Sequence, residues 1–128
     1  MYTLFLNDSP VINVQGRKHQ YNFATDGSLP NPLDMAYATL AGCAGVYAKK
    51  ACKKLEKSAE GIQILGKIVA KPENPSQVQK WVATVQFPSG WQEQEKQMVL
   101  DEIQHCAVKE LIKNGQDIVF LTEEGLLS

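Results

Sequence analysis

The feature that most constrains the fold of this chain is an uncharged run, rich in alanine and glycine, from Met35 to Ala48. The run falls short of the roughly 18 to 20 apolar residues that span a bilayer, so it predicts a buried helix and not a membrane span. Gly42 and Gly45 lie inside it, although glycine in a helix costs about 1 kcal/mol relative to alanine. We therefore expect them either to let another backbone approach closely or to leave space beside the neighbouring Cys43.

The ends of this helix carry clear signals. Asn31 is a favourable N-cap, Pro32 fits the first helical position, and Asp34 places a carboxylate in the first turn, where it complements the helix dipole. Lysines crowd the C-terminal half, where cations are favoured. The predicted helix runs from Asn31 to about Lys57.

The flanking segments predict a mixed fold. Alternating and β-branched residues, bounded by turn residues, predict strands at 2–7, 11–15 and 19–25 before the helix, and at 62–71, 77–87 and 117–122 after it. Residues 62–87 should form a hairpin with a longer loop. Apolar residues at helical spacing predict a second helix over 91–113, which Asn114 and Gly115 would cap. The expected order is β-β-β-α-β-β-α-β, an α+β class in a single domain, 1–128.

Composition limits the partners and the compartment. A net charge of -1 gives no electrostatic reason to expect nucleic acid or an anionic membrane as a partner. The first residues carry neither a basic segment nor an apolar core of signal-peptide length. With three cysteines, these features predict a cytoplasmic protein, in which disulfides are transient and catalytic.

The cysteines leave two interpretations open. Cys43, in the small-residue run, and Cys106, on the apolar stripe of the second helix, could form a redox pair, or both could be core packing. Cys52 follows Cys43 by nine positions, which places it on the opposite side of the helix, so we interpret it as structural. His105 adjoins Cys106, and no ligand spacing typical of zinc occurs. We expect no metal and no cofactor.

Two segments resemble a known family. The stretch from Asn31-Pro32 to Cys43 resembles the helix of the OsmC/Ohr family (osmotically inducible protein C and the organic hydroperoxide resistance proteins), which begins with a Pro-(x)-Glu-like motif and reaches a reactive cysteine after an alanine-rich stretch. Cys106-Ala107-Val108 resembles the family's second motif, Cys-Pro-Val. The order of elements is similar too, so the resemblance covers essentially the whole chain. It implies an OsmC-like α+β fold and an intertwined homodimer with buried central helices and active sites at the interface.

The resemblance also implies an activity. The protein would be a thiol-dependent organic hydroperoxide reductase in oxidative-stress defence, with Cys43 peroxidatic, Cys106 resolving and an external dithiol as reductant. Asp34 stands where many members have glutamate, and Ala107 replaces the motif's proline. Family peroxidases activate the thiolate with an arginine held by that glutamate, and Arg17, the only arginine here, is the candidate. The alternative is an OsmC-fold protein that binds a small molecule and whose cysteines only pack.

Overall fold

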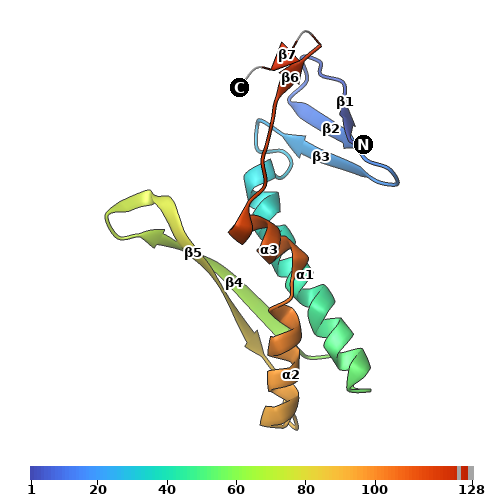
Figure 1. The fold of residues 1–128 in the computed structure, drawn as a ribbon, viewed down its shortest axis with the longest axis vertical. Helices are drawn as coiled ribbons and strands as arrows, with labels where there is room; N and C mark the ends of the chain where they lie inside the picture. Colours follow the sequence, from blue (N-terminus) through green and yellow to red (C-terminus); the bar gives the residue numbers. More distant parts are fainter. Residues whose placement is uncertain (124, 127–128) are drawn as a thin grey trace. The chain divides into compact units, whose positions relative to one another are not determined.

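A computed structural model describes residues 1–123 and 125–126. The chain divides into two compact units, residues 1–40 and 41–128. The long helix α1 (Pro32–Lys54) continues from the first unit into the second (Figure 1). Strands and helices occur together in an α+β arrangement, as predicted.

The first unit is built on a three-stranded antiparallel sheet in the order β1-β2-β3. The strands are β1 (Thr3–Leu4), β2 (Val11–Gln15) and β3 (Gln20–Ala24). Asn13 lies directly opposite Asn22, and its side-chain amide donates a hydrogen bond of 2.7 Å to the Asn22 oxygen. The three predicted strands are confirmed, although β1 is much shorter than residues 2–7.

Both ends of α1 are capped. The Asn31 side-chain oxygen accepts the backbone N–H of Asp34 at 2.9 Å, which confirms the predicted N-cap. The helix ends at Lys54, because Glu56 adopts a left-handed conformation with φ of 54°. The N–H of Lys57 then bonds back to a carbonyl of the last turn at 2.9 Å. Residues 55–57, which the sequence predicts as helical, therefore form the C-terminal cap of α1.

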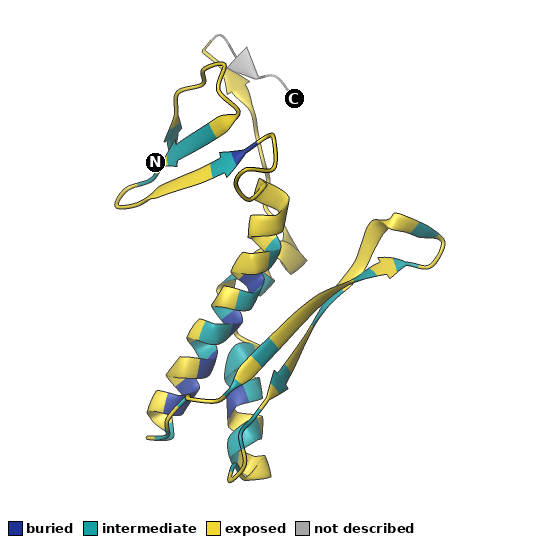
Figure 2. Cartoon of the chain, turned by 180° about the vertical axis from the view of Figure 1, so that it is seen from behind, coloured by how far each residue is buried: buried dark blue, intermediate teal, exposed yellow. Residues whose placement is uncertain are grey.

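One side of α1 is covered within the chain and the other is not. Leu40, Ala44 and Ala48 are buried, whereas Gly42 and Val46 are exposed, and Figure 2 shows this contrast along the helix. The predicted burial thus holds for one face. In the described part of the chain, no helix is both long and apolar enough to cross a membrane.

The second unit contains an antiparallel hairpin of β4 (Gln63–Lys71) and β5 (Asn74–Gln86). Only Pro72 and Glu73 separate the two strands, so the predicted longer loop is wrong. Gly66 has a packing role, because a Cβ atom there would overlap the indole ring of Trp81. The absence of a side chain at Gly66 lets that ring lie across the neighbouring strand.

The predicted helix over 91–113 is two helices, α2 (Glu93–Ile103) and α3 (Ala107–Asn114). The N–H of Cys106 bonds to the Ile103 carbonyl three residues back at 3.0 Å, and the Cys106 backbone leaves the helical region with ψ of 122°. Cys106 is therefore the N-cap of α3 and not a residue within a longer helix. The prediction failed because apolar spacing continues through the break.

The end of the chain also differs from the prediction. Gly115 follows α3 with φ of 75° and donates its N–H to a carbonyl of the last turn at 2.9 Å, which confirms the predicted glycine cap. The strand predicted over 117–122 is mostly wrong. Only β6 (Leu121–Thr122) is a strand, and it pairs with β7 (Gly125–Leu126).

The core of the second unit joins α1, the hairpin and α2. Ala48, Ala51 and Val99 form its buried centre. The partly buried residues around them are Leu55, Ile64, Phe87, Trp91 and Ile103. Because α1 and α2 share this core, the start of α3, only three residues beyond α2, is held close to α1.

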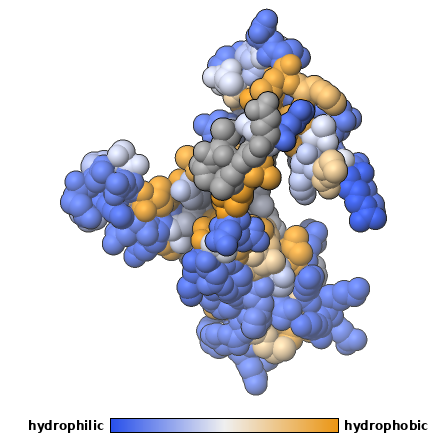
Figure 3. All heavy atoms as spheres, turned by 45° about the horizontal axis from the view of Figure 1, so that its top comes forward, coloured by the Kyte–Doolittle hydropathy of each residue, from blue (hydrophilic) through white to orange (hydrophobic). Residues whose placement is uncertain are grey.

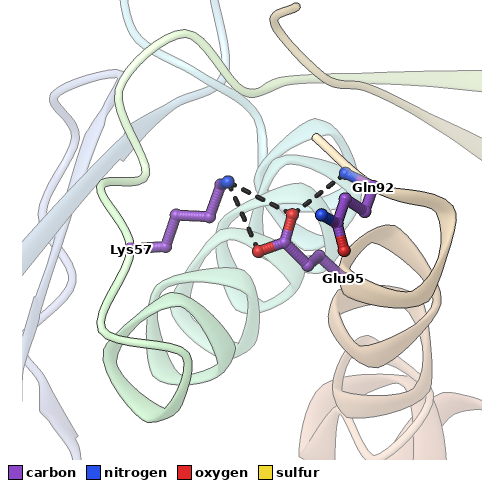
Figure 4. A network of polar contacts seen from close by, with 3 residues as sticks. All are labelled: Lys57, Gln92 and Glu95. Atoms are coloured by element: carbon purple, nitrogen blue, oxygen red, sulfur yellow. Dashed lines mark hydrogen bonds and ion pairs between the residues drawn. The ribbon is translucent and has the colours of Figure 1, made fainter. Parts of the chain in front are cut away.

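A polar contact fixes the beginning of α2 beside the end of α1. Glu95 accepts the backbone N–H of Gln92 at 2.9 Å and pairs with the Lys57 ammonium at 3.2 Å (Figure 4). The hydrogen bond from the N–H of Gln92, and then the hydrogen bond from Lys57, hold the pKa of Glu95 below its usual range. The same ammonium lies 4.8 Å from the centre of the Trp91 ring. These contacts set the position of α2 relative to α1.

Candidate functional site

The structure brings the thiols of Cys43 and Cys106 together within the second unit. Cys43 lies in α1 and is half-buried, whereas Cys106 caps α3 and is 3% exposed. The two thiols are neighbours that shift each other's pKa, and neither forms a disulfide. Neighbouring free thiols are candidates for a disulfide.

The environment of Cys43 favours its thiolate. Burial, the largest single influence, raises the pKa of the Cys43 thiol. Hydrogen bonds from the Cys106 thiol and from the backbone N–H groups of Val108 and Ala107 act in the opposite direction, as does the charge of Lys50. Together they bring the pKa of Cys43 below its ordinary value.

Cys106 has the opposite tendency. Burial raises the pKa of its thiol, and the hydrogen bond that this thiol donates to Cys43 raises it further. When the pair loses its first proton, the negative charge therefore resides on Cys43, and Cys106 remains the neutral donor. A half-buried nucleophile with a lowered pKa beside a buried, protonated thiol is the division of roles that a two-cysteine reaction needs.

Cys52 lies outside this pair. It is 2% exposed, and burial raises the pKa of its thiol, although the nearby charge of Lys57 partly opposes the change. A buried, protonated thiol is a poor nucleophile. These observations fit the structural role that its position on the helix predicts.

The two other predicted site residues belong to the first unit. Arg17 is exposed in the turn between β2 and β3, and Asp34 is exposed in the first turn of α1. Within residues 1–123 and 125–126, no ion pair joins their side chains. Their predicted role in activating Cys43 stays a prediction.

Sequence reasoning missed three contributors to the site: Lys50, Ala107 and Val108. Lys50 could have been found, since it follows Cys43 by seven residues and so lies on the same face of the helix. The backbone donors of Ala107 and Val108 could not, because in an unbroken helix their N–H groups would bond to carbonyls of the preceding turn.

The described residues contain no group of three or more His, Cys, Asp or Glu side chains that could hold a metal ion.

Comparison with known proteins identifies the fold. No family model matches the chain, and no curated protein matches its sequence significantly. Among solved structures, it is similar to an OsmC-like protein from Mycoplasma pneumoniae, with a TM-score of 0.67 and 12% identity over 88% of this chain and 86% of that one. It is equally similar to a protein of Psychrobacter arcticus 273-4 described as an osmotic stress induced and detoxification response protein, with a TM-score of 0.67 and 12% identity over 85% of both chains. The chain therefore has the OsmC-like fold that its sequence predicts.

Proposed function

We propose that this protein is a thiol-dependent hydroperoxide reductase of the OsmC family, in which Cys43 is the peroxidatic cysteine and Cys106 the resolving cysteine. The observation that carries the proposal is the pair of neighbouring free thiols, Cys43 and Cys106, whose pKa values are shifted in opposite directions. The OsmC-like fold supports this proposal. One protein of similar structure is described as an osmotic stress induced and detoxification response protein. Organic hydroperoxides are the proposed substrates and an external dithiol the proposed reductant.

The lowered pKa of Cys43 and the raised pKa of Cys106 determine which sulfur reacts first. The Cys43 thiolate attacks the terminal oxygen of the hydroperoxide, the O–O bond breaks, and the alkoxide leaves and takes up a proton to become an alcohol. Cys43 is now a sulfenic acid. The Cys106 sulfur attacks the Cys43 sulfur, the S–O bond breaks, and the hydroxide leaves as water with the Cys106 proton. An external dithiol then supplies two electrons and reduces the disulfide by exchange.

The test is a stoichiometric oxidation. One equivalent of cumene hydroperoxide or t-butyl hydroperoxide should convert Cys43 and Cys106 into an intrasubunit disulfide, because the two free thiols are neighbours within one chain. Peptide mapping by mass spectrometry would identify the bond. Cys43→Ser should abolish peroxide consumption, and Cys106→Ser should leave Cys43 to over-oxidise to the sulfinic acid.

Cys52→Ser is the matched control, because it removes a thiol of the same helix that faces away from the pair. This variant should keep full turnover with dithiol and peroxide. A disulfide that contains Cys52 would remove the resolving role from Cys106. Unchanged free thiols after peroxide treatment would favour the alternative, a small-molecule binding protein whose cysteines only pack.

A further inference from the structure

Two ion pairs join the end of α1 to α2. The Lys57 ammonium lies 3.2 Å from the Glu95 carboxylate, and the Lys54 ammonium lies 2.9 Å from the Glu102 carboxylate. The backbone N–H of Lys57 is bonded to the Cys52 carbonyl at 2.9 Å, which ties this residue to the last turn of α1. Glu95 lies in the first turn of α2 and Glu102 in its last, so the two pairs hold both ends of α2.

The pair of Lys57 and Glu95 is the better protected of the two. Its side chains are 29% and 26% exposed, whereas the Lys54 side chain is 65% exposed. An ion pair that is partly shielded from water is screened less by salt. Lys96 and Glu93 also form an ion pair, at 3.2 Å, but both belong to α2, so it joins no two elements.

The packing of α1 against α2 brings Cys43 and Cys106 to the same level. The helix α2 runs alongside α1 in the opposite direction (Figure 1). Val99 of α2 packs with Ala48 and Ala51 of α1 in the core. At a rise of about 1.5 Å per residue, Cys43 lies about 10 Å from these alanines, and Cys106 lies about 10 Å beyond Val99. This placement follows from core packing and helix geometry alone.

The turn that leads from α2 to Cys106 is short and hydrogen-bonded. The carbonyl of Glu102 accepts the N–H of His105 at 3.1 Å, and the carbonyl of Ile103 accepts the N–H of Cys106 at 3.0 Å. A shift of α2 along or away from α1 is therefore passed on to Cys106. The contacts that hold α2 against α1 also control the distance between the two thiols.

We propose that the ion pair of Lys57 and Glu95 positions Cys106 for disulfide formation. Both are positioning residues, since they act on the thiols through α2. The pair of Lys54 and Glu102 adds a weaker contact of the same kind. Groups that are held in place before they react gain effective concentration. The inference rests on the proposed function only in giving Cys106 the resolving role, and it can be tested without any peroxide.

The measurement is the equilibrium of the Cys43–Cys106 disulfide with hydroxyethyl disulfide, an uncharged reagent. The two thiols lose two protons and two electrons as their S–S bond forms. The S–S bond of the reagent breaks and yields two molecules of 2-mercaptoethanol. The equilibrium constant has the dimension of a concentration and measures how closely the chain holds the two sulfurs together. Alkylation of the free thiols and peptide mapping quantify the disulfide.

Glu95→Gln is the central variant. It removes the charge that pairs with Lys57 but keeps a side-chain oxygen for the N–H of Gln92, and glutamine also completes a capping box. We expect the equilibrium constant to fall about threefold, because a charge-assisted hydrogen bond between the helices is lost. Lys57→Gln should lower it at least as much. The double variant should fall no lower than Lys57→Gln, because both changes remove the same interaction.

Two controls separate positioning from charge and from stability. Glu93→Gln removes the ion pair within α2 and should leave the constant unchanged. Gly66→Ala strains the hairpin, so it should lower the stability to urea but not the constant. A Glu95→Gln constant equal to that of wild type would overturn the proposal. An equal loss in Glu93→Gln would overturn it too, because the effect would then be one of charge alone.

A second measurement needs no variant. Raising sodium chloride from about 0.05 to about 1 M weakens ion pairs that water reaches. The reagent is uncharged, so a response belongs to the protein, and the wild-type constant should fall about twofold. A constant that does not respond to salt would contradict the inference. A chain that shows these effects but consumes no hydroperoxide would support the inference and contradict the proposed function. Turnover of hydroperoxide with the same constant in every variant would do the reverse.

Discussion

Arg17 and the start of α3 offer two different ways to stabilise a negative charge on Cys43. A guanidinium would do so as a full charge, oriented by a carboxylate such as Asp34. The backbone does so with partial charges whose positions are fixed by the fold and cost no side-chain entropy. The influences that lower the pKa of Cys43 are the Cys106 thiol, the backbone N–H groups of Val108 and Ala107, and the charge of Lys50.

A comparison of Arg17 variants distinguishes the two. If the backbone donors suffice, Arg17→Ala should leave the pH dependence of Cys43 alkylation unchanged. Arg17→Lys should then behave as wild type too, as expected for an exposed turn residue. Slower alkylation in both variants would instead give Arg17 its predicted activating role, because a lysine does not reproduce the planar fork of the guanidinium.

Some residues of the site could be predicted from the sequence and others could not. Asn31 could be placed, because capping depends on its own side chain. Cys43 and Cys106 could be identified as a candidate pair, because the segments around them resemble two motifs of a known family. The donors of Ala107 and Val108 could not be predicted, because their availability depends on a helix break that neither side chain signals.

At the scale of elements, the hairpin depends on the close contact between Gly66 and Trp81. Gly66→Ala should destabilise the protein by about 1 to 3 kcal/mol, since a methyl group would overlap the indole ring and force it to move. Urea unfolding followed by tryptophan fluorescence measures this change. In a Trp81→Leu background the same substitution should cost far less, and an equal cost in both backgrounds would mean that the ring is not the cause.

The break between α2 and α3 was missed for a physical reason. Residues 91–113 were predicted as one helix because apolar side chains recur through the break at Gln104, His105 and Cys106. Periodicity records which side faces the core, and α2 and α3 both present an apolar side. A cysteine cap is also not among the residue types that signal a helix start. The hairpin, α1 and the first three strands carry stronger local signals and were predicted correctly in type.

At the scale of the whole molecule, much apolar surface is left uncovered. Among residues 1–40, Ala24 and Leu40 are the buried apolar residues, which is little for a stable unit of this size. Phe5 is 81% exposed and Phe120 is 64% exposed. Figure 3 shows apolar side chains at the surface on one face of the molecule. We therefore expect a second copy of the chain to cover part of this surface, as in the homodimer that the family resemblance implies.

The open face of α1 provides the sharpest test of that dimer. A Cβ atom built at Gly42 or Gly45 meets nothing within 4 Å in the chain, so no contact inside the described chain requires glycine there. Replacing Gly42 by alanine in a lone helix should stabilise it by about 1 kcal/mol. Against a closely packed partner helix, a larger side chain should instead separate the subunits.

Sedimentation of wild type and Gly42→Leu decides between these outcomes. We expect wild type to sediment as a dimer at micromolar concentration, with a large apolar interface. Gly42→Leu should dissociate at least tenfold more readily, because the added side chain would occupy the space that the partner backbone needs. A stable wild-type monomer would contradict the dimer. If wild type is a dimer and Gly42→Leu leaves it intact, the interface lies on another surface of the chain.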